Sequence, residues 1–186
     1  MTLFEMKEKI LALVEEGNPE SLFLTEDPDI AGKLCHVIDQ LQFELARIKK
    51  LPRLLELPVS AGQTLDFSAL AQAAGAEIYQ LGNVTGASCS LLAGGTVLWF
   101  WEDGVAKIEC FVYPARITSQ TEDTAKLELS PDCLALLPYG AAADLLKSDP
   151  VAQYGKVYAD RYETMLRRLD PRYAVGGIRV EGGVAL

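Results

Sequence analysis

The residues that could carry out chemistry are few, and their spacing does not match a known catalytic pattern. His36 is the only histidine among 186 residues, so any nucleophile activated by an imidazole would depend on it. Residues 86–90, Gly-Ala-Ser-Cys-Ser, begin like the G-x-S-x-G turn of hydrolases but lack its second glycine and its strand–turn–helix context. We expect His36 to be a solvated side chain on the polar side of a helix. A small hydrolase that uses Ser88 with His36 is the third of three hypotheses for the function, after two non-catalytic ones described below.

Metal and cofactor motifs are equally sparse. The four cysteines, Cys35, Cys89, Cys110 and Cys133, include no C-x-x-C pair, which argues against a zinc ribbon or a thioredoxin-like site. The chain has no G-x-G-x-x-G, and the Gly-Gly at 94–95 is not followed by the Lys-Ser or Lys-Thr of a phosphate loop. We therefore expect reduced thiols packed as small apolar groups, no metal, no cofactor and no enzymatic activity.

Two groups of side chains remain as candidates for binding. Trp99 and Trp101 fall on one face of a predicted strand, where indole rings can stack on a ligand or, alternatively, pack in the core or against a subunit. Arg161, Arg168 and Arg172 share one face of a predicted helix, because Arg168 and Arg172 follow Arg161 by 7 and 11 positions. Such a face is suited to binding phosphate or an acidic neighbouring protein. The alternative is a solvated helix face that binds nothing.

Composition and charge restrict the class of protein. The chain is 49% hydrophobic and 23% charged, as in a folded globular protein. Seventeen Lys and Arg against 26 Asp and Glu give a net charge of −9, which disfavours binding to nucleic acid or to an anionic membrane surface. We also expect no membrane span, because no stretch approaches roughly 18 uncharged apolar residues. Six charged side chains within residues 1–17 argue against a signal peptide.

Two helices are predicted in the N-terminal part. Residues 3–16 are rich in Leu, Glu and Lys and end at a Gly-Asn-Pro stop. The second helix begins at Asp27 and Pro28, an N-cap followed by proline at the first helical position, and ends before Pro52. Its apolar side chains recur at helical spacing and predict one stripe over about five turns: Ile30, Leu34, Val37, Ile38, Leu41, Leu45 and Ile48.

The middle of the chain changes to short strands bounded by Gly and Pro. Strands are predicted at residues 54–59, 77–81, 96–101, 105–113 and 126–129. The Glu-Asp-Gly at 102–104 predicts a hairpin between the third and fourth of these, because Asp-Gly tolerates the positive φ of such turns. The Ala-rich residues 67–76 are expected to be a loop or one helical turn. Together these strands predict a small antiparallel sheet or barrel.

The C-terminal part returns to helices. Ser130, Pro131 and Asp132 start one helix, in which Pro138 predicts a kink or a late start. Residues 148–150, Ser-Asp-Pro, start the last helix in the same way, and Pro171 ends it. The apolar stripe of the last helix is Val151, Tyr154, Tyr158, Tyr162, Met165, Leu166 and Leu169.

These elements predict an α+β protein: a helical bundle of two N-terminal and two C-terminal helices with an inserted small antiparallel β domain. The expected boundaries are 1–52 for the N-terminal helices, 53–129 for the β domain, 130–170 for the closing helices and 171–186 for a flexible Gly-rich tail. Such a tail can order on a partner at assembly. The candidate partner-binding residues are therefore Arg161, Arg168, Arg172, Tyr173, Ile178 and Val180.

Several segments, in this order, resemble a known family. They are Asp39-Gln40 at the centre of the second helix, Tyr-Pro-Ala-Arg-Ile-Thr at 113–118, Thr-Glu-Asp-Thr at 121–124, Leu-Glu-Leu-Ser at 127–130, and Leu-Pro-Tyr-Gly-Ala-Ala-Ala-Asp-Leu-Leu at 137–146, followed by Asp149 and Tyr162-Glu163. Over about residues 25–170 the chain resembles the head–tail connector, or adaptor, proteins of tailed bacteriophages. The N-terminal helix and the Gly-rich tail depart from that pattern.

The resemblance implies a structural virion protein. Subunits would form a ring, commonly twelve-fold, beneath the portal protein, and would also meet tail-completion or stopper proteins. DNA would pass through the channel without specific binding, and the isolated chain is expected to be a monomer that assembles on the portal. The implied location is the neck of the virion, with the host cytoplasm during assembly. The alternative is a non-catalytic module that binds a peptide or carbohydrate through Trp99 and Trp101.

Overall fold

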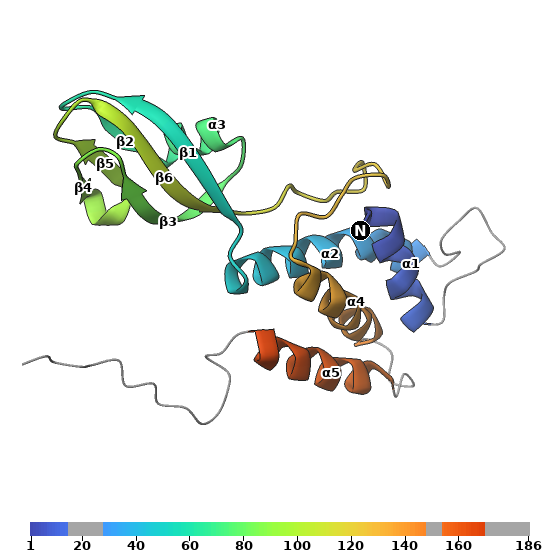
Figure 1. Ribbon diagram of the computed structural model, residues 1–186. Helices are drawn as coiled ribbons and strands as arrows, with labels where there is room; N and C mark the ends of the chain where they lie inside the picture. The colour runs from blue at the N-terminus through green and yellow to red at the C-terminus, as the bar shows by residue number, and fades with distance from the viewer. Residues whose placement is uncertain (15–27, 148–153, 170–186) are drawn as a thin grey trace, which may run out of the picture.

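The computed structural model describes residues 1–14, 28–147 and 154–169. It confirms an α+β fold, with helices at both ends of the chain and a small antiparallel β unit between them (Figure 1). The helices are α1 (Leu3–Leu13), α2 (Pro28–Ile48), α3 (Phe67–Ala74), α4 (Pro131–Leu146) and α5 (Tyr154–Leu169), with a short 3₁₀ turn at Ala93–Gly95. The strands are β1 (Pro52–Val59), β2 (Thr64–Asp66), β3 (Ile78–Thr85), β4 (Cys89–Leu92), β5 (Val97–Phe100) and β6 (Gly104–Val112).

Helices α1, α2, α4 and α5 form one unit with its own apolar core, the helical unit. The predicted stripe of α2 is confirmed, since Leu34, Ile38 and Leu45 are among its buried side chains. Helix α1 begins with a capping box that was not predicted: the Thr2 hydroxyl accepts from the Glu5 amide, and the Glu5 carboxylate accepts from the Thr2 amide. This arrangement satisfies two backbone donors at the start of the helix.

Helix α4 packs against α1, α2 and α5 and therefore lies at the centre of the helical unit. Its N-cap is Ser130, as predicted, and Pro131 occupies the first turn. The helix does not start late, because it is already formed at Pro131 and continues through Pro138. Pro138 is buried.

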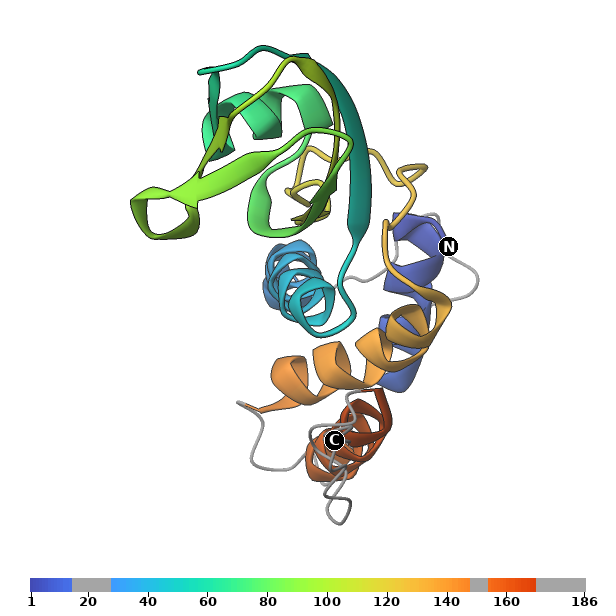
Figure 2. The ribbon, with the colours of Figure 1, turned by 60° about the vertical axis from the view of Figure 1, so that its left-hand side comes forward.

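The β unit consists of two three-stranded antiparallel sheets, ordered β1–β6–β3 and β2–β5–β4. Side chains from both sheets and from α3 share a single core, at whose centre Phe100 and Ile108 are fully buried. Along β6 the residues alternate between buried and more exposed, because successive side chains of a strand point to opposite faces. In both views of the molecule, α2 lies between this unit and α4 (Figures 1 and 2).

The predicted hairpin at residues 102–104 is wrong. Strands β5 and β6 belong to different sheets, and each is the central strand of its own sheet, so neither has a free edge for the other. Gly104 does not take a positive φ. The Asp103 carboxylate instead accepts a hydrogen bond of 2.7 Å from the Ala61 amide, which holds the crossover turn against the β1–β2 connection.

The predicted strand at residues 126–129 is also wrong. Only Lys126 takes part in a β-bridge, with Thr2 beside α1. The alternating apolar side chains that suggested a strand, together with Ile117, enter the core of the helical unit instead. Residues 113–129, which were predicted to belong to the β domain, therefore form a connection that packs on the helices.

Three further elements of the β unit differ from expectation. Residues 67–74 form two turns of helix, α3, because the Asp66 carboxylate caps the Ala69 amide and Gly75 ends the helix with φ +64°. Strands β2, at Thr64–Asp66, and β4, at Cys89–Leu92, were not among the predicted strands. The predicted start of the last helix and the tail of residues 171–186 lie outside the described residues. Among the described helices, none is long and apolar enough to cross a bilayer.

Candidate functional site

Helix α5 carries the candidate arginines and is held by aromatic and apolar packing on α4. Most of its predicted stripe is partly buried against the helical core, namely Tyr158, Tyr162, Met165, Leu166 and Leu169. Tyr154, also predicted in the stripe, is exposed, and Val151 lies outside the described residues. The Tyr162 ring can approach α4 closely because residue 140 is glycine: a Cβ built there would lie 2.8 Å from that ring. Burial raises the pKa of the Tyr162 phenol, so this side chain stays neutral. The Tyr158 hydroxyl donates to the Leu13 carbonyl at 2.9 Å and ties α5 to α1.

The structure places Arg161 and Arg168 on the same exposed surface. Both line a hollow of about 490 Å³, together with Asp160, Thr164 and Met165. The Arg161 guanidinium lies 4.3 Å from the centroid of the Tyr139 ring, a cation–π contact that fixes its position on α4. The other candidate partner-binding residues, Arg172, Tyr173, Ile178 and Val180, lie outside the described residues.

A second hollow of about 350 Å³ continues from the first, since Met165 and Arg168 line both. Its wall includes Lys49 just beyond α2 and Asp132 at the start of α4, and its apolar lining includes Leu136. We call the two hollows together the α5 groove. Lys49 was not among the predicted site residues, because its place beside Arg168 depends on how α2 and α5 each pack on α4 and has no signal in the sequence.

A second cluster of polar residues connects the two units, and we call it the joint. Asp39 of α2 is only 8% exposed and accepts from the Ile117 amide at 2.8 Å and from the Arg116 guanidinium at 3.1 Å. Gln42, 1% exposed, donates to Asp39 at 3.0 Å and to the Ala115 carbonyl at 2.8 Å. The cluster pins residues 115–117, which follow the last strand, onto α2.

Aromatic rings extend the joint from α2 to the β unit. The Arg116 guanidinium lies 3.9 Å from the Phe43 ring centroid, and the Phe43 ring stacks on Tyr113 at 4.6 Å. Tyr113 in turn contacts Tyr79 of β3 at 4.7 Å. The Tyr79 hydroxyl donates to the Ala46 carbonyl of α2 at 2.8 Å, and its pKa is raised by burial and by the neighbouring Tyr113. Strand β3 and the exit of β6 are thus both attached to one helix.

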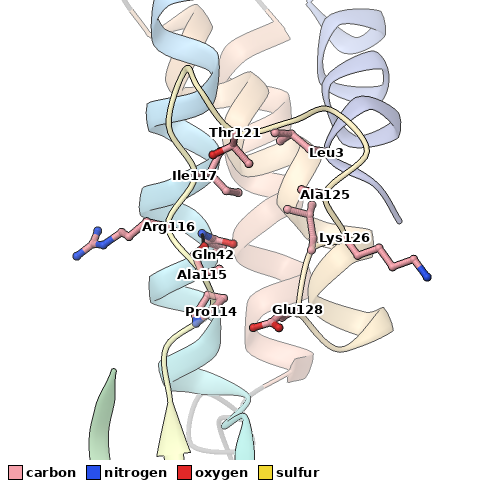
Figure 3. Close-up of a pocket in the computed structure, with 11 residues that line it drawn as sticks. Leu3, Gln42, Pro114, Ala115, Arg116, Ile117, Thr121, Ala125, Lys126 and Glu128 are labelled. Carbon is pink, nitrogen blue, oxygen red and sulfur yellow. Dashed lines mark hydrogen bonds between the residues drawn. The ribbon is translucent and has the colours of Figure 1, made fainter. Parts of the chain in front are cut away.

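The cavity beside the joint is too small for a substrate. It measures about 40 Å³ and is lined by side chains of α1, α2 and the 113–129 connection (Figure 3). Gln42 borders this space, whereas the Arg116 side chain extends away from it (Figure 3). Small-molecule sites occupy roughly 300–1,000 Å³, so this cavity has room for no more than a few water molecules.

The tryptophan pair predicted on one strand face is found on the outer side of the second sheet. The rings of Trp99 and Trp101 meet edge to face at 4.0 Å. Trp101 is 57% exposed, and its indole N–H donates to the Ser90 hydroxyl at 3.0 Å. Leu91 and Leu92 on neighbouring β4 are also exposed, so this end of the β unit presents an apolar surface.

The residues of the hydrolase hypothesis are not brought together. The Ser88 hydroxyl donates to the Glu102 carboxylate at 2.7 Å, and this bond, with one from the Ser88 amide, lowers the pKa of Glu102. His36 is exposed on α2, in the other unit. Burial raises the pKa of the Cys110 thiol to about 11, the opposite of what activates a nucleophilic cysteine.

Within residues 1–14, 28–147 and 154–169, no cluster of His, Cys, Asp and Glu has the arrangement of a metal site. No protein-family model matches the chain, and no curated protein sequence matches it. Functional proposals for this chain therefore depend on the resemblance of its sequence segments and on the geometry of the joint, the tryptophan surface and the α5 groove.

Proposed function

We propose that the protein is a head–tail connector subunit of a tailed bacteriophage or prophage. It would form a ring, commonly twelve-fold, beneath the portal protein and join the DNA-filled head to the tail through tail-completion or stopper proteins. The role is structural, with no catalysis and no cofactor. The chain would act in the virion neck after assembly in the host cytoplasm.

The observation that carries the proposal is the convergence of the motifs on which the resemblance rests. Asp39, at the centre of the second helix, pairs with Arg116 of the 113–118 segment. The 137–146 segment forms most of α4, which packs between its three helical neighbours. Segments that are far apart in the sequence thus belong to one packed unit, which supports the resemblance.

The charge of the chain supports the same role. A connector must let DNA pass without holding it, and a net charge of −9 repels the phosphate backbone. The joint fixes the β unit on α2 through a partly buried ion pair, hydrogen bonds and stacked rings. A subunit built in this way can present its helical unit and its β unit to different neighbours.

The exposed Trp101 supports the alternative, a module that binds a peptide or carbohydrate. An indole that is 57% exposed next to a second indole provides a face on which a sugar ring or an aromatic side chain can stack. Quenching of tryptophan fluorescence by such a ligand, abolished in Trp101→Ala, would favour this function.

The test of the connector is electron microscopy of lysates from a phage or induced prophage in which this gene is deleted. We expect DNA-filled or leaking heads separated from complete tails, and rescue by the gene supplied in trans. Trp101→Ala supplied in the same way is the matched control for the alternative function. Intact, infectious particles in the deletion lysate would contradict the proposal.

A further inference from the structure

The α5 groove combines an apolar floor with cations that have no ion-pair partner among the described residues. Met165 and the buried Leu136 form part of the floor. Within the described residues, Arg168 and Lys49 have no carboxylate within ion-pair distance, whereas Arg167 on the same helical turn pairs with Glu163 at 3.2 Å. In a chain of net charge −9, exposed and unpaired cations around an apolar surface favour an acidic, partly apolar occupant.

The chain itself presents a surface of this kind on α1. Phe4, Glu8 and Ala12 are exposed and lie four residues apart, so they share one face of the helix. Phe4 is 41% exposed although large aromatic side chains are usually buried. We call Phe4, Glu8 and Ala12 the α1 face. It places a carboxylate between an aromatic ring and a small methyl group. This complements a groove with an apolar floor in which three cations, Lys49, Arg161 and Arg168, outnumber the two carboxylates of Asp132 and Asp160.

The two surfaces lie on different parts of the helical unit. The second hollow of the groove lies where α2 and α5 end, near Lys49 and Leu169, and the first extends from there along α5 to Arg161. Helix α1 lies toward the start of α5, where Tyr158 contacts Leu13 (Figure 1). The two surfaces are therefore placed for contact between two copies rather than within one. When complementary surfaces are different patches of a subunit, the contact is head-to-tail, and such contacts close into rings when the rotation allows.

We propose that the α1 face of one copy docks in the α5 groove of the next copy. The Phe4 ring would cover the apolar floor of the groove, while the Glu8 carboxylate would lie among Lys49, Arg161 and Arg168. The small Ala12 side chain would let the α1 backbone approach the groove closely. This inference names the subunit contact of the proposed ring and in that respect rests on the proposed function.

The experiment uses two full-length variants, Glu8→Lys, which reverses the charge of the α1 face, and Arg168→Glu, which reverses a charge of the groove. Both side chains are exposed, so both variants are expected to fold. Sedimentation equilibrium is measured over a concentration series up to about 1 mM, because a contact that normally forms on the portal is weak between isolated chains. The wild-type chain, expected to be a monomer when dilute, should self-associate toward the top of this series. Each variant alone should associate at least about tenfold more weakly.

An equimolar mixture of the two variants should associate more strongly than either variant alone. The Arg168→Glu chain keeps an intact α1 face, and the Glu8→Lys chain keeps an intact groove, so one wild-type contact can form between unlike chains. In the other contact of the same pair, the lysine at position 8 would face the glutamate at position 168, which again places opposite charges together. This rescue is not expected if the two substitutions act at unrelated surfaces.

Arg167→Glu is the matched control, because it reverses a charge on the same turn of α5 outside the groove. It should associate like the wild-type chain. The inference is overturned if the wild-type chain stays monomeric throughout, if Arg167→Glu weakens association as much as Arg168→Glu, or if the mixture associates no better than the separate variants. These outcomes do not depend on a phage, so they are distinguishable from failure of the deletion test, in which particles form without the gene.

Discussion

The helical unit and the β unit use polar groups in opposite ways. Asp39 and Gln42, the two buried polar residues among those that the structure describes, both lie on α2 in the helical unit. The buried core of the β unit is apolar throughout, and that unit carries five of the eight exposed large hydrophobic side chains: Leu54, Leu91, Leu92, Trp101 and Val105. The helical unit therefore uses buried hydrogen bonds to hold a connection in place, whereas the β unit buries an apolar core and leaves further apolar side chains exposed.

This comparison predicts that the two cores respond to mutation separately. Phe100→Ala in the β unit and Leu45→Ala in the helical unit each remove a fully buried side chain. The free energy of unfolding should fall by about 3–5 kcal/mol for Phe100→Ala and by about 2–5 kcal/mol for Leu45→Ala. Hydrogen exchange should show each loss of protection mainly in the unit that carries the change. Leu91→Ala, on the exposed surface, is the control and should cost less than about 0.5 kcal/mol. Equal loss of protection in both units for either core variant would show that they form one core.

Gly140→Ala should give the next largest effect. The new methyl group would lie 2.8 Å from the Tyr162 ring and 3.2 Å from Leu41, so α4 and α5 would have to move apart. This should lower the free energy of unfolding by about 1–3 kcal/mol. Gly32→Ala is the matched control on α2, where nothing lies within 4 Å, and it should stabilise the chain by about 0.5–1 kcal/mol. Urea unfolding measures both, and a Gly140→Ala chain as stable as the wild type would contradict the packing described.

Asp39→Asn should cost less, about 1 kcal/mol. The amide keeps a hydrogen-bond acceptor for the Ile117 amide but loses the charge that faces Arg116, whose guanidinium is largely exposed and therefore screened. Glu56→Gln, which breaks the exposed ion pair with Lys107 in the β unit, should have an effect close to zero. Chemical denaturation of the two variants compares them, and equal effects would show that the joint contributes no more than a surface pair.

The smallest expected effect is a pH dependence from Cys110. Burial, and next the neighbouring Glu109, raise the pKa of its thiol from 9.0 to about 11. The folded state then binds more protons than the unfolded state between these values, so its contribution to stability is present below pH 9 and is lost as the pH rises through about 11. Cys110→Ala should remove this part of the alkaline decline, measured as the difference in urea midpoints between pH 8 and about 11. An equal loss of stability in the wild-type and Cys110→Ala chains over this pH range would contradict the prediction.

The helices could be predicted because their signal is local. The spacing of Ile38, Leu41 and Leu45 alone defines the buried face of α2, and Ser130 defines the start of α4. Strand pairing depends on residues far apart in the chain, so the adjacency of β5 and β6 suggested a hairpin that the two sheets do not contain. Leu127 and Leu129 alternate as in a strand, yet the core they enter is helical.

The candidate site, too, was predictable only where its signal is local in the sequence. The shared face of Arg161 and Arg168 follows from helical spacing, whereas Lys49 joins them only through the packing of α2 and α5 on α4. Asp39 and Arg116 of the joint both belong to segments on which the family resemblance rests. That these two side chains pair with each other could be known only from the fold. Residues 171–186, which carry four of the six candidates, lie outside the described residues and keep their status as predictions.

The most direct test of the connector role is to locate the chain in purified virions. Particles carrying an epitope-tagged copy of the gene, labelled with gold-conjugated antibody, would be viewed by electron microscopy, with untagged particles as the control. We predict label at the junction of head and tail and nowhere else on the particle. Absence of the chain from purified particles, established by mass spectrometry of the same preparation, would contradict the account.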